Sequence, residues 1–257
     1  MLRDYQIELE EKVFKIFDRD CKSLLVQLPT GTGKTTLFSS IIKKQITEYS
    51  PGKRVLILVH RRELVYQIYD RLRKFHLRPS KIISGEDHDL LKQVQVASIQ
   101  TLIRKKEKPK NISLIVVDEA HHILSNTYRN IIEDYPTSKI LGVTATPIRL
   151  NGEGFEEVFD KLICGKQIPW FIKNGYLANF KHYGVKTDNL ESISVDSIKM
   201  DYNTQKLSEL MSNKKVIGNV VDAIKKYAHT KKTIVFCVNG YFGPNCARLF
   251  GFIAPVI

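Results

Sequence analysis

Residues 28–35 have the residue types and spacing of a loop that binds nucleotide phosphates. They fit the pattern G-x-x-x-x-G-K-[ST], except that Leu28 occupies the first glycine position. Two glycines allow positive φ and a close approach of the backbone to an anion. Lys34 would reach the β and γ phosphates, and the Thr35 hydroxyl would ligate Mg²⁺. The alternative is an ordinary glycine-rich turn. The residues expected around the phosphates are Thr30, Gly31, Thr32, Gly33, Lys34 and Thr35.

A second group of candidate residues, Asp118 and Glu119, follows the most apolar stretch of the chain, residues 112–117. Acidic side chains at the end of a buried strand are costly to bury unless they are paired. A Mg²⁺ ion at Asp118 would offset that cost, and Glu119 would then polarise an attacking water. The tetrapeptide Asp-Glu-Ala-His arises by chance now and then. Its place after an apolar strand and beyond a phosphate loop favours a catalytic interpretation.

Two pairs of residues are candidates for binding nucleic-acid phosphates. Arg61 and Arg62 follow the apolar run 54–59 after one histidine and begin the next helix. Because positive charge is unfavourable at a helix N-terminus, a phosphate-binding role is favoured over a simple surface cluster. Ser98 and Thr101 follow another apolar run, and they would either cap the next helix or donate to phosphates.

Gln6 lies near the N-terminus, within the segment Arg-Asp-Tyr-Gln that begins at Arg3. Its amide offers one donor and one acceptor, which suits bidentate pairing with the edge of adenine. A glutamine on the surface of an amphipathic helix is the alternative, because residues 5–17 have apolar residues at helical spacing.

The elements that would position these residues alternate between strands and helices. Apolar runs predict strands at 23–27, 54–59, 81–84, 94–97, 112–117 and 139–143, and helical spacing predicts helices over 5–17 and 36–46. This alternation predicts an α/β fold with a doubly wound, mostly parallel sheet and right-handed crossovers. Ligands of such sheets bind beyond the carboxyl ends of the strands. One cleft is therefore expected to collect Lys34, Arg61, Asp118 and Thr144.

The composition is that of an ordinary globular protein with a strong excess of basic residues. The 257 residues include 40 Lys and Arg against 27 Asp and Glu, which gives a formal net charge of +13. This charge favours a polyanionic partner, with nucleic acid preferred over a membrane surface. A solvated lysine-rich surface is the alternative, and we expect the basic loop at 105–110 to be of that kind.

Targeting signals and structural cysteines are not evident. The four cysteines are scattered without a C-x-x-C pair, so they indicate neither a zinc site nor a disulfide framework and fit a reducing compartment. The N-terminus has no apolar signal core, and no run approaches the roughly 20 apolar residues of a membrane span.

Taken together, these motifs resemble the first motor domain of a superfamily 2 DNA helicase of the DEAH-box type, which has a RecA-like fold. The matching segments are 3–6 (the Q motif), 28–35 (motif I), 59–64 (motif Ia), 97–102 (a strand-binding motif), 118–121 (the DEAH box) and 144–146 (motif III). The resemblance implies ATP and Mg²⁺ as cofactors and DNA, single-stranded or branched, as a partner more readily than RNA. It also implies that His121, Thr144 and Thr146 couple hydrolysis to nucleic-acid binding.

The segments that follow motif III resemble the RadD-like branch of bacterial and phage DNA helicases, which has kinship with restriction-enzyme motor subunits. They are residues 142–152, Phe159-Asp160 and 175–177. This resemblance implies a cytoplasmic, nucleoid-associated protein of a bacterial or phage-infected cell.

The resemblance predicts three parts of the chain: a first RecA-like domain at 1–164, a crossover and helical segment at 165–229, and the start of an incomplete second RecA-like domain at 230–257. Residues 214–227 are expected to be helical, and residues 232–237 resemble motif IV, after which the family pattern does not continue. We therefore expect a truncated chain.

Activity is the point on which the sequence leaves alternatives open. In the family, arginines of the second domain stabilise the transferred phosphate, a contribution of about 10³ to 10⁵ in rate. We therefore expect ATP binding with weak hydrolysis. A nucleic-acid-binding module without catalysis and the motor part of a restriction complex are the alternatives. A metabolic kinase would not need Asp-Glu-Ala-His followed by Thr-Ala-Thr.

Overall fold

The computed structural model describes residues 2–147, 155–183, 195–196, 201–202, 222–228 and 232–233. The chain divides into two compact units, Met1–Asn179 and Phe180–Ile257. The three-part division expected from the sequence stays a prediction. Most of the expected motif IV strand at 232–237 and the first part of the helix expected at 214–227 lie outside the described residues. The same holds for residues 148–152 and for the apolar residues 250–257.

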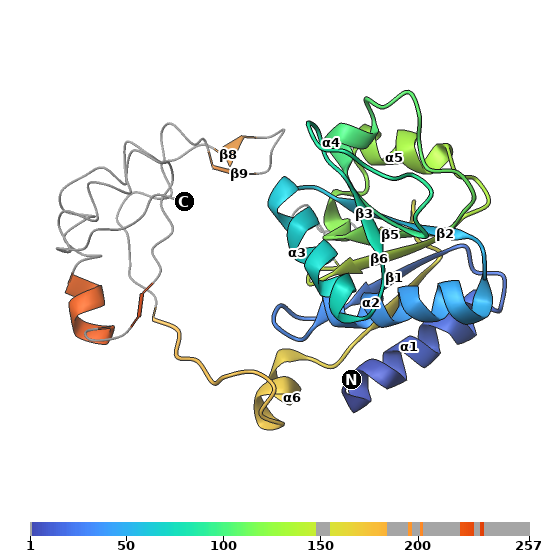
Figure 1. Cartoon of the computed structure of the whole chain (residues 1–257). Coiled ribbons are helices and arrows are strands. Elements are labelled where there is room, and N and C mark those ends of the chain that lie inside the picture. The colour runs from blue at the N-terminus through green and yellow to red at the C-terminus, as the bar shows by residue number, and fades with distance from the viewer. Residues whose placement is uncertain are drawn as a thin grey trace. The chain divides into compact units, whose positions relative to one another are not determined.

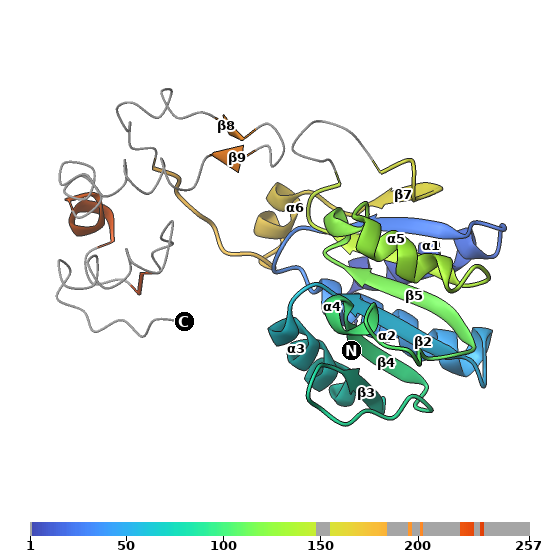
Figure 2. The same ribbon diagram turned by 90° about the horizontal axis from the view of Figure 1, so that it is seen from above.

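The first unit is built on a seven-stranded sheet in which every neighbouring pair is parallel. Its strand order is β3-β4-β2-β5-β6-β1-β7, with β3 and β7 at opposite edges (Figure 2). The strands are β1 (Ser23–Gln27), β2 (Arg54–Val59), β3 (Pro79–Ile82), β4 (Val94–Ser98), β5 (Ile112–Asp118), β6 (Lys139–Thr144) and β7 (Lys161–Cys164). The predicted α/β fold class with a parallel sheet is confirmed.

Helices cover both faces of this sheet. Figure 1 shows α1 and α2 below the sheet and α4 and α5 above it. The helices are α1 (Asp4–Phe17), α2 (Lys34–Lys44), α3 (Arg62–Lys74), α4 (Ile99–Leu102), α5 (Asn126–Glu133) and α6 (Ile168–Lys173), with a π-helical turn η1 (Gln45–Tyr49) and a 3₁₀ turn η2 (Ala120–His122).

Two apolar cores lie on the two faces of the sheet. Alternate strand residues enter different cores, as Val26 packs with α1, α2 and α3 while its neighbour Leu25 packs with α4 and α5. A strand buried on both faces needs apolar side chains at successive positions. This is why the predicted strands appear in the sequence as continuous apolar runs, with β5 buried along its whole length.

The second unit is described only in short pieces. Two-residue strands β8 (Val195–Asp196) and β9 (Asp201–Tyr202) pair in antiparallel fashion. Residues 222–227 are helical, and the ring of Tyr227 stacks on that of Tyr183 with centroids 4.1 Å apart. No helix among the described residues is long and apolar enough to cross a membrane.

Candidate functional site

The loop between β1 and α2 takes the backbone shape that its glycines permit. Gly31 has φ of 81° and Gly33, which caps α2, has φ of 85° and ψ of 39°. Gly33 carries a second constraint, because a Cβ there would lie 2.7 Å from the Nε2 atom of Gln6. No side chain caps the start of α2. The free amides of its first turn are therefore available to an anion at the positive end of the helix dipole.

Leu28, the one departure from the phosphate-loop pattern, belongs to the apolar core. It is fully buried, and its backbone N–H donates to the carbonyl oxygen of Thr144 at 3.0 Å. Its side chain lies against Gly165, where a Cβ would come within 2.6 Å of Leu28 Cδ2. Leucine at this position thus extends the core beneath the loop, and the loop conformation is set by Gly31 and Gly33.

The loop is braced from α1 by Tyr5 and Gln6. The Tyr5 hydroxyl donates to the Thr32 carbonyl oxygen at 2.6 Å, and Gln6 Nε2 donates to the Gly33 carbonyl oxygen at 3.1 Å. Gln6 Oε1 accepts from the backbone N–H of Arg3 at 3.0 Å, so both ends of this 3 % exposed amide bind backbone groups. The structure therefore gives Gln6 a role in holding the loop, and its pairing with adenine stays a prediction.

Asp118 meets the phosphate loop in one cavity. The cavity measures about 410 Å³, and its lining includes Lys34, Thr35 and Asp118 together with Gly31 and Gly33. Burial, and then the neighbouring Glu119, raise the pKa of Asp118 to about 6, although Lys34 opposes the shift. The charge of this buried carboxylate is poorly compensated, and the Thr35 side chain lines the same cavity. Carboxylate and hydroxyl oxygens together suit a hard cation such as Mg²⁺.

Glu119 holds a strained backbone conformation directly after Asp118. Its φ of 50° and ψ of 58° lie in the left-handed region, which is uncommon for a residue with a Cβ and occurs preferentially at functional sites. The side chain is 37 % exposed, and its Oε2 lies 3.4 Å from Nδ1 of His121. Glu119 is therefore accessible to water at the end of β5.

Three histidines connect the ends of β5 and β2. The ring of His122 stacks on that of His60 with centroids 4.5 Å apart, and it also lies 4.1 Å from the ring of His121. Burial lowers the pKa of His122, and the nearby His121 and His60 lower it further. A neutral His122 can therefore keep this stack at neutral pH, and the stack joins the segment after Asp118 to the segment that begins with Arg61.

The Thr-Ala-Thr segment after β6 is fastened to the end of β1. Thr144 is fully buried, and its hydroxyl oxygen accepts from the backbone N–H of Thr146 at 3.2 Å. Gln27 Nε2 donates to the carbonyl oxygen of Ala145 at 3.2 Å. These contacts place Thr144 and Thr146 next to the start of the phosphate loop, while their coupling role and that of His121 stay predictions.

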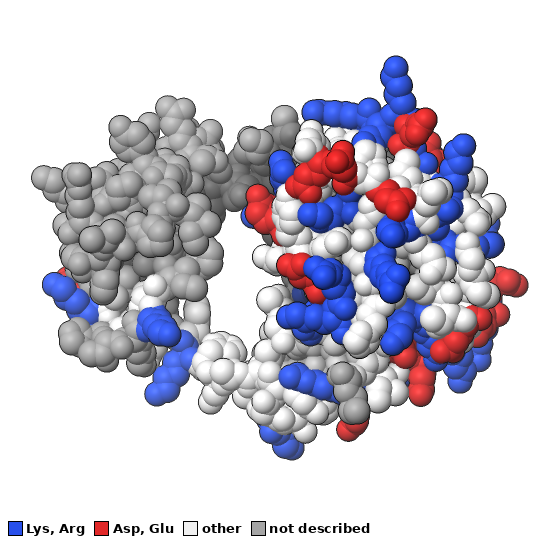
Figure 3. All heavy atoms as spheres, in the orientation of Figure 1, with Lys and Arg blue, Asp and Glu red and all other residues white. Residues whose placement is uncertain are grey.

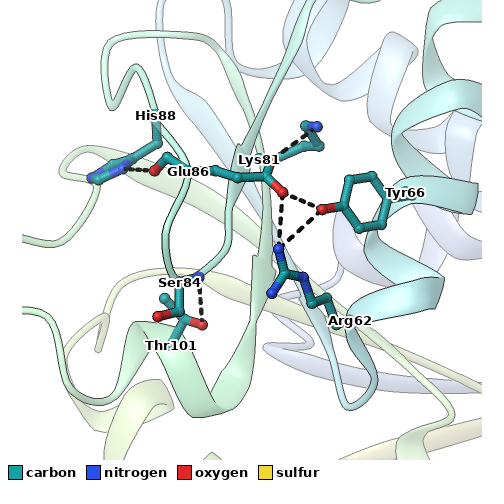
Figure 4. A network of polar contacts seen from close by, with 7 residues as sticks. All are labelled: Arg62, Tyr66, Lys81, Ser84, Glu86, His88 and Thr101. Atoms are coloured by element: carbon teal, nitrogen blue, oxygen red, sulfur yellow. Dashed lines mark hydrogen bonds and ion pairs between the residues drawn. The ribbon is translucent and has the colours of Figure 1, made fainter.

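The residues predicted to bind nucleic acid are largely engaged with protein groups. Glu86 accepts hydrogen bonds from Tyr66 and from Arg62, the latter at 3.2 Å, and lies 3.0 Å from Lys81 Nζ (Figure 4). These contacts, that from Tyr66 first, lower the pKa of Glu86 to about 2. The Thr101 hydroxyl accepts from the backbone N–H of Ser84 at 3.2 Å.

Arg61 and Ser98 differ in whether their side chains are free to bind a phosphate. Ser98 is buried and donates to Gln100 Oε1 at 2.9 Å. Arg61 is exposed and makes no ion pair with any described residue.

Of the four residues expected to share one cleft, Lys34 and Asp118 line the 410 Å³ cavity, whereas Arg61 and Thr144 do not.

Four residues of α3 line this cavity, and two of them are polar residues that were not predicted for the site. These two are Gln67 and Arg71, and the Arg71 guanidinium donates to the hydroxyl of Thr36. Arg71 has no carboxylate partner in the described part of the chain. The two side chains lie four residues apart on one face of a helix. Their helical spacing could have shown that these two residues share one face of the helix. The sequence does not reveal that this face lies against the phosphate loop.

Comparison with known proteins identifies the family. The family model ResIII, described as the Type III restriction enzyme res subunit, matches residues 1–149. This chain belongs to the ResIII family. It is 33 % identical to the putative ATP-dependent helicase IRC3 of Saccharomyces cerevisiae, over 97 % of this chain and 39 % of that protein. It is also 33 % identical to a 51.5 kDa protein of a Lactococcus phage, over 82 % of this chain and 43 % of that protein.

The ResIII chain thus spans about two fifths of the length of these relatives. The crystal structure of the Pyrococcus furiosus Hef helicase domain has the same fold, with a TM-score of 0.56 and 22 % identity over 89 % of this chain and 48 % of that chain. Together these findings make the first unit a helicase-family ATPase motor domain related to superfamily 2 helicases.

Proposed function

We propose that this chain binds ATP with Mg²⁺ and supplies the first motor domain of a DNA-directed helicase of the DEAH-box type and the RadD-like branch. The observation that carries the proposal is the single cavity that joins Lys34 and Thr35 of the phosphate loop to Asp118 at the end of β5. Three segments distant in sequence, including Arg71 of α3, supply both a cation site and positive charge to one small space.

Each residue has a separable role in this proposal. Lys34 and the amides at the start of α2 would hold the β and γ phosphates, and Thr35 and Asp118 would hold Mg²⁺. The metal would neutralise charge on the phosphoryl group. Glu119, which is accessible to solvent, would orient the attacking water and accept its proton.

DNA is the proposed polyanion for two reasons. The matching family is named for a restriction enzyme, a class that acts on DNA. The chain also carries a formal net charge of +13, which favours association with a phosphate backbone. Exposed Arg61 and the Arg62 side chain beside Glu86 provide cations near the carboxyl ends of β2 and β3.

Slow turnover is expected from the first unit. Phosphoryl transfer in this superfamily draws on arginines of a second motor domain, and Arg71 is the arginine that lines the cavity in the described part of this chain. We therefore propose firm nucleotide binding with weak hydrolysis.

The proposal is tested by ATP binding and hydrolysis with and without single-stranded DNA. Lys34→Ala should abolish nucleotide binding, because the phosphates lose their principal side-chain cation. Lys43→Ala is the matched control, since Lys43 is exposed near the other end of the same helix. Equal ATP affinity in Lys34→Ala and in the unmodified chain would overturn the proposal.

A motor part of a restriction complex is a second candidate, which the description of the matching family favours. Such motors would move along duplex DNA. Displacement of a third strand from a DNA triplex, without separation of the duplex, would support this candidate over a helicase.

A further inference from the structure

A hollow at the amino edge of the sheet is lined by three separate loops, two of which supply its lysines. The loops precede β2, β5 and β6, which are neighbours or next neighbours in the sheet. Because parallel strands begin at one edge, residues distant in sequence come together there. The hollow measures about 530 Å³ and is lined by Lys53, Lys105, Lys106, Lys108, Pro109, Lys110, Asn111, Ile112, Asp134, Tyr135, Pro136, Thr137 and Ser138. We call this set the amino-edge hollow.

The amino-edge hollow carries positive charge that the protein does not neutralise. Of its five lysines, Lys108 pairs with Asp134, the acidic residue of the lining, and Lys105 Nζ lies 2.8 Å from Nε2 of His88. The remaining three make no ion pair with a described residue: Lys53, Lys106 and Lys110. In the space-filling view, Lys and Arg side chains project over α4 and the loop after it (Figure 3).

The lining of the same hollow includes a polar group without a partner among the described residues. The Tyr135 hydroxyl is buried and has no hydrogen-bond partner among the described residues. Buried polar groups in native proteins are nearly always hydrogen-bonded, so such a group calls for an explanation. Burial, and then Asp134, raise the pKa of Tyr135 to about 12, which keeps the hydroxyl protonated as a donor.

The chemistry of the hollow favours a phosphodiester backbone over other polyanions. Protein interfaces are depleted in lysine and rich in exposed aromatic anchors and arginine. The hollow has many lysines, no arginine, and none of the large exposed apolar side chains of the described residues. Lysine is a compact, strongly hydrated charge that suits phosphate contacts which fix position without reading bases.

We infer that the amino-edge hollow is a second nucleic-acid contact, which binds the phosphate backbone of duplex DNA. It lies at the opposite ends of the strands from the phosphate loop, and β2 and β5 separate the two edges by about 20 Å at roughly 3.3 Å per residue. The nucleic acid bound there is therefore a different stretch from the one at the carboxyl edge. The inference does not depend on ATP chemistry.

The salt dependence of DNA binding tests this inference. The full chain and the triple variant Lys53→Gln, Lys106→Gln, Lys110→Gln are titrated against a fluorescein-labelled duplex of mixed sequence at a series of salt concentrations. Each lost phosphate contact lowers the slope of log affinity against log salt by about 0.9. We expect the slope to fall by about 2 to 3 in the triple variant.

A second triple variant, Lys15→Gln, Lys173→Gln, Lys181→Gln, is the control for net charge, because these three lysines are exposed and lie outside the hollow. The inference is overturned if the slope is unchanged in the first variant, or if it falls equally in both variants. An unchanged slope would mean that the hollow binds an acidic protein or is simply solvated. Thermal unfolding of both variants checks that each is folded. Nucleotide binding is measured in parallel as a separate test of the proposed function. If the chain bound no nucleotide, the proposed function would be refuted, but the salt slopes would be interpreted in the same way.

Discussion

The amide nitrogen of Gln6 lies 3.1 Å from the carbonyl oxygen of Gly33, and it also occupies the space that a side chain on Gly33 would need. A helix at the start of the chain thus sets the shape of a loop that follows the first strand. The absence of a side chain at Gly33 serves this contact as well as the positive φ of the residue.

Gly33→Ala should destabilise the protein by more than backbone strain alone. A left-handed alanine costs roughly 1–2 kcal/mol, and at Gly33 the new methyl group also collides with Gln6. Gly52→Ala is the matched control, because Gly52 has φ of 81° and nothing within 4 Å of an added Cβ. Denaturant unfolding of the two variants compares the losses, and equal losses would show that the collision has no consequence.

Gln6→Ala should weaken binding of ATP and GTP by a similar factor. The reason is that Gln6 holds the backbone of the phosphate loop, which both nucleotides would use. Fluorescence titration with labelled analogues of each nucleotide gives the two ratios. A loss confined to ATP would instead establish the adenine-reading role.

Arg71→Ala should lower ATP affinity by about tenfold or more, and ADP affinity by less. A hydrogen bond to a charged group contributes about 1.5–3 kcal/mol, and Arg71 faces the cavity of Lys34 with no carboxylate partner in the described part. Arg73→Ala provides the control, because Arg73 is exposed on the same helix and does not line the cavity. Its Cζ atom lies 6.0 Å from the centroid of the Tyr69 ring. Equal titration curves for the two variants would remove Arg71 from the site.

Asp118→Asn should make the metal-free protein more stable at neutral pH. The folded pKa of about 6 lies above the value of 3.8 expected for the unfolded chain, so the charged carboxylate is disfavoured in the fold. The penalty is about 3 kcal/mol above pH 6, decreases as the pH falls towards 3.8, and is absent below it. Unfolding free energies at pH 7 and pH 4 without Mg²⁺ measure it; a variant that is less stable than the parent at pH 7 would contradict the prediction.

Glu86→Gln should raise DNA affinity at low salt. The carboxylate holds Arg62 and Lys81, and its pKa of about 2 keeps it ionised at working pH. Its neutral replacement leaves both cations free for phosphates, and the gain should vanish at high salt because of screening. Glu11→Gln, an exposed acid on α1 without an ion pair in the described residues, makes the same change of charge. A comparable gain in that variant would attribute the effect to net charge.

The sequence predicted the sheet well where strands are buried on both faces. Continuous apolar runs such as 54–59 and 112–117 are typical of such strands. It missed β7, whose residues are mostly exposed at the edge of the sheet. The β3 strand begins at Pro79, two residues before the predicted segment, since Pro79 and Ser80 are buried without an apolar pattern.

The candidate site was predictable where one segment supplies it and unpredictable where partners come from afar. The glycine-rich loop and Asp118 were proposed from local patterns, and the structure brings them to one cavity. The pairing of Arg62 with Glu86, 24 residues away, was not, and neither was the brace from Tyr5 to Thr32, 27 residues away. The lysines at 105–110, interpreted as a solvated loop, lie beside Lys53, which no local pattern indicates.

The packing of Leu28 against Gly165 has a consequence for how this loop varies in evolution. A side chain of leucine size at position 28 leaves no room for even a methyl group at position 165. The carbonyl oxygen of Gln27 would lie 2.9 Å from the same added Cβ, so a smaller residue at position 28 would not open this space. Position 165 should therefore stay glycine in relatives, whether the first loop position is leucine or glycine. A search pattern for such loops would be more sensitive if it asked for a glycine directly after the edge strand β7, in place of an obligatory glycine at the first loop position.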